Sequence, residues 1–285
     1  MNLRDIVVVL DAGTASEERL RLATSIARQH EACLSAVFVQ DERVAEFPSG
    51  LSVPRLGLMA GAPVPIATTE FSRSAILADT AEQRFRDCLR SFRGEGDWYA
   101  LDRAGTPELI ALARAADLII IGQVKPRARH ASIVRPEEIV VACGRPVLMV
   151  PYIGSYAQVG RRVLVAWDGS REAARALNDA LPVINNAEAV TVTTVRAHVK
   201  DSERDHVSMN RIIRHLTRHG VAVRAEEMLR GSNTIADVLL SRAADYAVDL
   251  IVAGAYHHSP LREAFVGGVS RGLFQHMTVP VLMSH

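Results

Sequence analysis

The feature that most constrains the fold is an internal repeat. Arg4 begins the segment RDIVVVLDAGTASEERLRLA, and Arg161 begins RRVLVAWDGSREAARALNDA. Each contains an apolar run, an aspartate, a glycine, a small hydroxyl residue and then an amphipathic stretch. The halves also end alike, in AADLIIIG and RPVLMVP and in AVDLIVAG and VPVLMSH. Such self-similarity indicates a duplicated domain, and 285 residues are enough for two medium-sized domains.

The boundary between the copies is expected in PYIGSYAQVGR, residues 151–161, which lacks an apolar period. We therefore predict domains at residues 1–152 and 160–285. In the second copy, β-like runs alternate with stretches of helical period. Runs such as DLIVAG have no polar alternation, which is typical of parallel strands covered on both faces.

This pattern predicts an α/β fold, namely two tandem doubly wound parallel-sheet domains of five strands each, in the order 3-2-1-4-5. We expect the copies to pack as a pseudo-dimer. The candidate contact is formed by the apolar strands in PVLMVP and PVLMS, because exposed hydrophobic edges need covering.

The first copy follows the same plan with a different middle. Thr14-Ala-Ser-Glu17 has the spacing of a capping box that would begin its first helix. Residues 47–65 are a Pro- and Gly-rich loop, which is either a tolerated surface insertion or a lid. A long helix is expected at about 66–93.

Composition excludes several classes of partner. The net charge is +1 and no basic block occurs, whereas binding to a phosphate backbone needs a concentrated basic surface. We therefore do not expect nucleic acid as a partner. No apolar stretch reaches about 18 residues, and MNLRDIVVVLD lacks the features of a signal peptide. We expect a cytoplasmic protein without a membrane partner.

The strand order places a candidate ligand site in the second copy. Doubly wound sheets bind ligands beyond the carboxyl ends of their strands, where the strand order reverses. Asp168 follows the first strand and Gly254 ends the fourth, and these strands are expected to be neighbours. Residues 267–268 are a glycine pair at the start of the last helix, where free N–H groups favour an anion. An aspartate after a strand also often caps the following turn, and both roles are compatible.

Several of these residues resemble a known family. The strand that ends before Asp168, the turn at Gly254, the step at residues 267–269 and the terminal PVLMS resemble the universal stress protein family in its tandem-domain form. The resemblance covers nearly the whole chain. Nucleotide-binding members of that family carry glycine, two residues, glycine, nine residues, glycine and then Ser or Thr.

The spacing of that motif is kept, with two departures. Gly254 and Gly267 match its first and third glycines, but His257 stands at the second and Gly268 replaces the hydroxyl residue. The imidazole of His257 either obstructs the phosphates or, when protonated, helps to hold an anion. Ser270 still offers a hydroxyl two residues after Gly268.

The resemblance implies that ATP or another adenine nucleotide is bound, with or without Mg²⁺. It also implies the binding residues: Ala166, Asp168 and Val195 would face the adenosine, and Gly254, Gly267, Gly268 and Val269 the phosphates, beside His257 and Ser270.

The first copy is more degenerate in this motif. Gly122 is present, but Lys125, Arg135 and Pro136 occupy the other three positions. We interpret this copy as structural and non-binding, with Asp11 and Gly122 retained mainly for the turn.

Two motifs in the sequence are compatible with other chemistries. Residues 268–272 read G-x-S-x-G around Ser270, the pattern of a hydrolase nucleophile elbow, but no Asp or Glu follows to complete a triad. A serine hydrolase is therefore a minor alternative. His215 and His219 have a spacing that can bind zinc, yet their basic surroundings favour a solvated helix face.

Two functional hypotheses follow. In the first, the chain is a stress-response regulatory protein whose second domain binds an adenine nucleotide, and binding alters its contacts with regulatory protein partners. In the second, it is a tandem scaffold that has lost nucleotide binding and acts through protein association. A homodimer of the tandem chain is compatible with both. No residue set resembles a general base for fast phosphoryl transfer, so at most slow ATP hydrolysis is expected.

Overall fold

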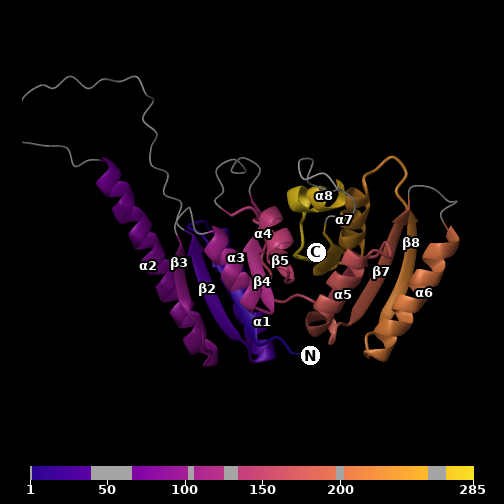
Figure 1. Ribbon diagram of the computed structural model, residues 1–285, viewed down its shortest axis with the longest axis horizontal. Helices are drawn as coiled ribbons and strands as arrows, with labels where there is room; N and C mark the ends of the chain where they lie inside the picture. Colours follow the sequence, from indigo (N-terminus) through magenta and orange to yellow (C-terminus); the bar gives the residue numbers. More distant parts are fainter. Residues whose placement is uncertain (1, 40–65, 102–105, 125–133, 197–201, 256–267) are drawn as a thin grey trace, which may run out of the picture.

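The computed structural model shows helices on both faces of one twisted sheet (Figure 1). It describes residues 2–39, 66–101, 106–124, 134–196, 202–255 and 268–285, and the side chains of residues 66–75 and 202–207 are not among those described. The loop at 47–65 and the site residues His257 and Gly267 therefore lie outside the described part of the chain.

Strands and helices alternate through both halves, as the periodicity predicts. The strands are β1 (Asp5–Leu10), β2 (Cys33–Val39), β3 (Trp98–Leu101), β4 (Leu118–Gly122), β5 (Val147–Val150), β6 (Arg162–Ala166), β7 (Ala189–Arg196), β8 (Val223–Leu229), β9 (Leu250–Gly254) and β10 (Val281–Ser284). The helices are α1 (Ala15–His30), α2 (Ile66–Phe92), α3 (Thr106–Ala115), α4 (Pro136–Ala142), α5 (Arg171–Ile184), α6 (Ser202–Arg218), α7 (Ile235–Asp245) and α8 (Gly268–His276).

The ten strands form one sheet in the order β3-β2-β1-β4-β5-β10-β9-β6-β7-β8. Each half therefore has the predicted order 3-2-1-4-5, and all pairings within a half are parallel. The halves join where β5 and β10 pair antiparallel, with Leu148 opposite Leu282. The predicted α/β fold and its pseudo-dimeric contact through the two PVLM segments are confirmed.

The strands alternate their side chains between two cores, because successive residues of a strand point to opposite faces. In β1, Ile6, Val8 and Leu10 belong to the core that contains residues of α1, α2, α5 and α6. Val7 and Val9 belong to the core that contains residues of α3, α4, α7 and α8. Burial on both faces explains why the central strands read as continuous apolar runs.

The aspartate that begins each DLI segment has the same role in both halves. The Asp117 carboxylate accepts hydrogen bonds from the backbone N–H groups of Arg4 and Asp5. The Asp249 carboxylate likewise accepts from Gly160, Arg161 and Arg162. Each aspartate ties the start of one central strand to the start of its neighbour, which explains why the motif occurs twice.

The predicted capping box at Thr14 is wrong. Thr14 precedes α1 in a helical conformation and its side chain makes no capping hydrogen bond. Instead, Ser16 Oγ accepts from the Asp11 N–H at 2.8 Å, so the hydroxyl that shapes this turn comes two residues later. The long helix expected at about 66–93 is present as α2.

Within the described ranges, none of the helices combines the length and the hydropathy that a bilayer crossing requires.

Candidate functional site

The site lies where the strand order of the second half reverses. The first strand of this half, β6, is flanked by β7 on one side and β9 on the other. The chain runs from β6 to β7 on one side and from β9 to β10 on the other. A crevice is therefore expected between the carboxyl ends of β6 and β9. A cavity of about 220 Å³ lies there.

The cavity collects residues from six elements and one turn. Of the nine residues that the sequence indicated, seven line it: Ala166, Asp168, Val195, Gly254, Gly268, Val269 and Ser270. The other two, His257 and Gly267, are outside the described residues. The sequence therefore predicted which strand ends would meet here.

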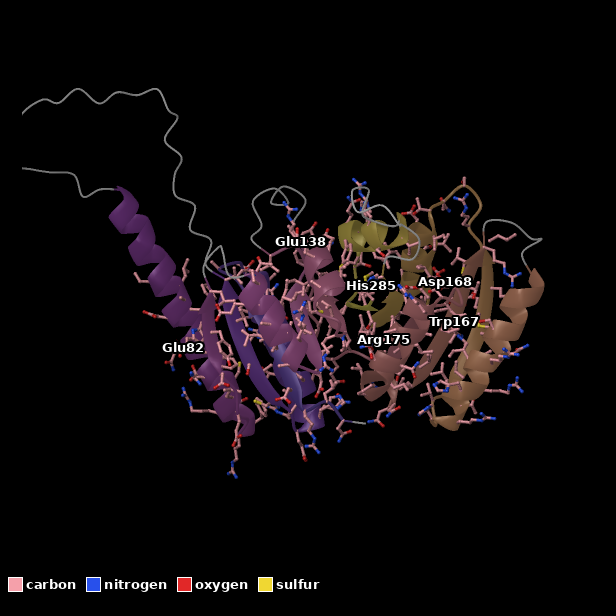
Figure 2. All side chains as sticks on the ribbon, viewed as in Figure 1. Glu82, Glu138, Trp167, Asp168, Arg175 and His285 are labelled. Atoms are coloured by element: carbon pink, nitrogen blue, oxygen red, sulfur yellow. The ribbon has the colours of Figure 1, made fainter. Side chains whose placement is uncertain are left out.

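Asp168 belongs to the turn between β6 and α5, and it is exposed at the cavity (Figure 2). Its Oδ1 accepts a hydrogen bond from the Ser170 N–H at 2.9 Å. Gly169 between them has φ +75°, in the region that favours glycine. Ser170 caps α5, with its Oγ accepting from the Ala173 N–H. The turn-forming role of Asp168 is thus present, and its contact with a ligand stays a prediction.

Gly254 is required by packing as well as by any ligand. A Cβ at this position would lie 2.5 Å from the Ala173 nitrogen and 2.6 Å from the Glu172 carbonyl carbon. Both are backbone atoms of α5, which cannot move aside cheaply. The missing side chain therefore allows α5 to lie directly against the end of β9.

The start of α8 forms another part of the wall. Gly268, Val269 and Ser270 line the cavity, and the first N–H groups of a helix lack partners within it. A Cβ added at Gly268 would meet no atom of the described residues within 4 Å. Backbone donors, the helix dipole and open space together suit an anionic group.

The sequence interpretation missed several wall residues. Thr193 on β7 and Ile235 and Leu239 on α7 also line the cavity. Thr193 could have been predicted from the strand period, because it lies two positions before Val195 and so faces the same side of the strand. The α7 residues needed the tertiary packing, since nothing in their sequence indicates which side of the sheet the helix covers.

In the first half, a buried side chain lies against Gly122, the counterpart of Gly254. Arg19 is 3% exposed, and its Nη1 lies 1.6 Å from where a Cβ of Gly122 would be. Its Nη2 donates to Asp11 Oδ2 at 2.7 Å and to Ser16 Oγ at 2.6 Å. Gly122 is not among the residues with positive φ. The expectation that it serves the turn is therefore wrong: its missing side chain makes room for Arg19.

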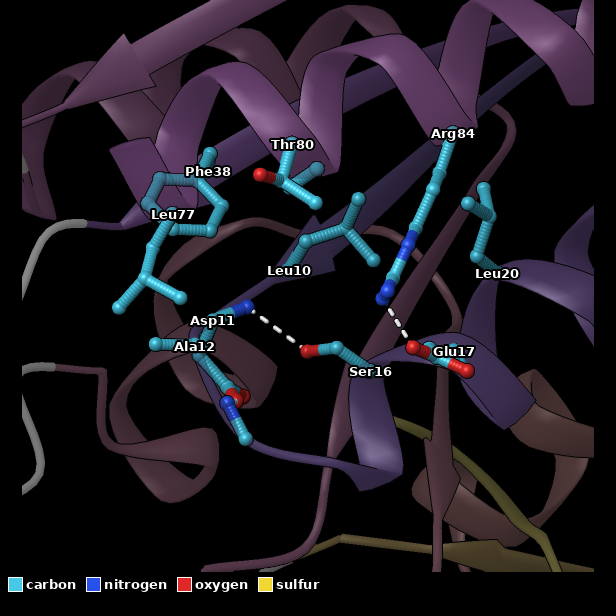
Figure 3. Close-up of a pocket in the computed structure, with 12 residues that line it drawn as sticks. Leu10, Asp11, Ala12, Ser16, Glu17, Leu20, Phe38, Leu77, Thr80 and Arg84 are labelled. Carbon is cyan, nitrogen blue, oxygen red and sulfur yellow. Dashed lines mark hydrogen bonds and ion pairs between the residues drawn. The ribbon is translucent and has the colours of Figure 1, made fainter. Parts of the chain in front are cut away.

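The first half also has a cavity, of about 110 Å³, on the face covered by α1 and α2 (Figure 3). Its floor is apolar and contains Leu10, Leu20 and Phe38. An ion pair between Glu17 of α1 and Arg84 of α2 lies at its rim. Because it lies between those two helices, it does not correspond to the cavity of the second half.

The two alternative chemistries find little geometric support. Ser270 lies in the first turn of α8 and is 3% exposed, whereas an elbow serine stands exposed at a strand-to-helix turn. His215 and His219 stack edge to face with ring centroids 4.6 Å apart. In the part of the chain that the structure describes, no three His, Cys, Asp or Glu side chains gather as metal ligands would.

Fold and site together define a tandem doubly wound α/β protein with a ligand-sized cavity at the switch point of its second half. The model of the universal stress protein family matches residues 160–285. Those residues belong to that family, and the chain as a whole has the fold of its tandem-domain form. No protein of curated function matches the sequence.

Solved structures show the same architecture over the full length. A universal stress protein from Archaeoglobus fulgidus DSM 4304 has a TM-score of 0.70 at 14% identity, covering 98% of this chain and 95% of that chain. A candidate universal stress protein from Pseudomonas aeruginosa UCBPP-PA14 has a TM-score of 0.62 at 16% identity, with 99% and 93% covered. A protein of unknown function from Pseudomonas aeruginosa PAO1 has a TM-score of 0.60 at 18% identity, with 99% and 92% covered. At these identities the likeness concerns the fold alone.

Proposed function

We propose that this chain is a stress-response regulatory protein whose second domain, residues 160–285, binds an adenine nucleotide, while its first domain, residues 1–152, is structural. The observation that carries the proposal is the cavity itself. It joins the ends of β6, β7 and β9 to the start of α8, and apolar walls there lie beside backbone donors. That combination suits a ligand with a flat apolar part and an anionic part.

The size of the cavity suggests how the ligand lies. About 220 Å³ is less than the roughly 300–1,000 Å³ of pockets that enclose whole drug-sized ligands. In the proposed pose, the base and ribose occupy the cavity and the phosphates lie at its mouth, against the start of α8. Asp168 is the one carboxylate among the described lining residues, so a Mg²⁺ ion would be held mainly by the phosphates.

One nucleotide per chain is expected, because the first half keeps only Gly122 of the four motif positions and has the buried Arg19 beside it. The buried guanidinium already has Asp11 as its counter-ion there. Nucleotide binding would bias the contacts of the second domain with regulatory protein partners, and the tandem chain could itself form a homodimer.

The experiment is calorimetric titration of ATP into wild type and Gly268→Val. The new Cβ meets no described residue within 4 Å, so the fold should be unaffected while the approach of phosphate to α8 is blocked. We expect a stoichiometry of one and an affinity at least about tenfold lower in the variant, which is about 1.4 kcal/mol.

Arg135→Val is the matched control, because it is the first-half counterpart of the glycine step and pairs only with exposed Glu138 among the described residues. It should bind ATP as wild type does. Absence of ATP binding by the wild-type protein would refute the proposal and favour the scaffold hypothesis. A stoichiometry of two would refute the structural role of the first domain.

A further inference from the structure

Thr193 has an unusual environment among the threonines of β7. It is 1% exposed, it lines the cavity, and its Oγ1 is shielded from solvent without a hydrogen-bond partner among the described residues. Its neighbours are satisfied: Thr191 Oγ1 accepts from Arg224 Nε at 2.7 Å, and Thr194 Oγ1 donates to the Trp167 carbonyl at 2.8 Å. A buried hydroxyl without a partner is unfavourable unless something else supplies one.

The position of Thr193 is deep in the cavity. Val195 is two residues closer to the carboxyl end of β7, so Thr193 lies about 7 Å further from the mouth along the strand. Its surroundings there are apolar, with Ala166 paired beside it and Leu239 and Ala253 also on the wall. Because Oγ1 makes no hydrogen bond to a described residue, rotation about χ1 can exchange the hydroxyl and methyl groups without breaking such a bond.

We infer that Thr193 is a specificity-determining residue whose hydroxyl hydrogen-bonds the polar edge of a planar heteroaromatic base. This inference rests on the proposed function and names the part of the ligand that enters first. Apolar walls favour a flat ring at this depth, and a charged phosphate would lose its hydration there without compensation. A threonine hydroxyl both donates and accepts, so it suits the ring nitrogens and the exocyclic amino group of adenine.

The test uses the nearly isosteric change Thr193→Val, with ATP and adenosine as probes. The variant should bind both ligands about threefold to tenfold more weakly, by the same factor, because the lost hydrogen bond is made to the base. The melting temperature without ligand should be unchanged or higher, since an unsatisfied hydroxyl has been removed. If Thr193 only stabilised β7, its replacement would lower the melting temperature.

Thr194→Val is the matched control on the same strand. It removes the hydrogen bond to the Trp167 carbonyl, so it should lower the melting temperature while leaving the affinities for ATP and for adenosine unchanged. Wild-type ATP binding with unchanged affinities in Thr193→Val would overturn the inference and leave the proposed function standing. Loss of ATP affinity without loss of adenosine affinity would also overturn it. A wild-type protein that binds neither probe would refute both.

Discussion

Arg19 carries a buried charge beside Gly122, the first-half counterpart of Gly254. Burial raises the pKa of its partner Asp11, but the charge and hydrogen bond of Arg19, with hydrogen bonds from Gly13 and Ser16, outweigh this and hold that pKa below its ordinary value of 3.8. A lowered folded-state pKa means that the ionised carboxylate stabilises the fold above the ordinary value, and that the stabilisation is lost as pH falls through the folded-state pKa.

This predicts a pH-dependent cost for Asp11→Asn. The variant leaves the Arg19 guanidinium without a counter-ion, and because Asp11 is 55% exposed the loss is screened to about 1–2 kcal/mol at pH 7. The difference from wild type should be constant between about pH 7 and pH 5 and shrink below about pH 4. Urea unfolding at four pH values measures it.

Glu138→Gln is the control, because it breaks an exposed pair with Arg135 and should cost about 0.5 kcal/mol or less. A difference for Asp11→Asn that stayed constant down to pH 3 would mean that the ion pair does not stabilise this turn.

Helix starts illustrate how single elements depend on their caps. Thr234 begins α7, one wall of the cavity, with a complete capping box: its Oγ1 accepts from the Asp237 N–H at 3.1 Å, and the Asp237 carboxylate accepts from the Thr234 N–H at 3.2 Å. Thr14 is also followed three residues later by an acidic residue, Glu17, but no capping box is formed there.

We therefore expect Thr234→Ala to lower the free energy of unfolding by about 1 kcal/mol, because one N–H at the start of α7 loses its acceptor. Thr14→Ala should change it by a few tenths of a kcal/mol at most. Denaturant titrations of both variants provide the comparison, and equal losses would contradict the difference between the two helix starts.

At the scale of the whole molecule, the first half supports the second through more than the β5–β10 pairing. Gln123 follows β4, and its Nε2 donates to the Phe274 carbonyl at 3.0 Å and to the Gln275 carbonyl at 3.3 Å. These carbonyls belong to the last turn of α8, whose first turn lines the cavity. Arg175 of α5 donates in the other direction, to the Gly144 carbonyl of the first half at 3.1 Å.

Gln123→Leu should lower the free energy of unfolding by about 1–2 kcal/mol, since it leaves carbonyl groups at the contact between the halves without their donor. Gln83→Leu, which removes an exposed hydrogen bond to Asp87 within α2, should have little effect. Guanidinium unfolding measures both, and a Gln123→Leu protein as stable as wild type would show that this contact contributes no net stability.

What the sequence alone determined is the part of the structure that depends on local period and on repetition. Apolar runs of strand length, amphipathic stretches between them and the repeated DLI and PVLM segments were enough to predict the strand order of each half and the contact between β5 and β10. The strand order then placed Asp168 beside Gly254, because the carboxyl ends of neighbouring parallel strands meet at one edge.

Only the tertiary structure decided what each of those positions does. Gly254 is required by the backbone of α5, and Gly122 by the side chain of Arg19. That Thr193 Oγ1 has no hydrogen-bond partner among the described residues can be seen only when its neighbours in space are known. Steric room, ion pairs and hydrogen-bond satisfaction are all set between residues far apart in the sequence, and so a local pattern indicates where such a residue stands but not what it contacts.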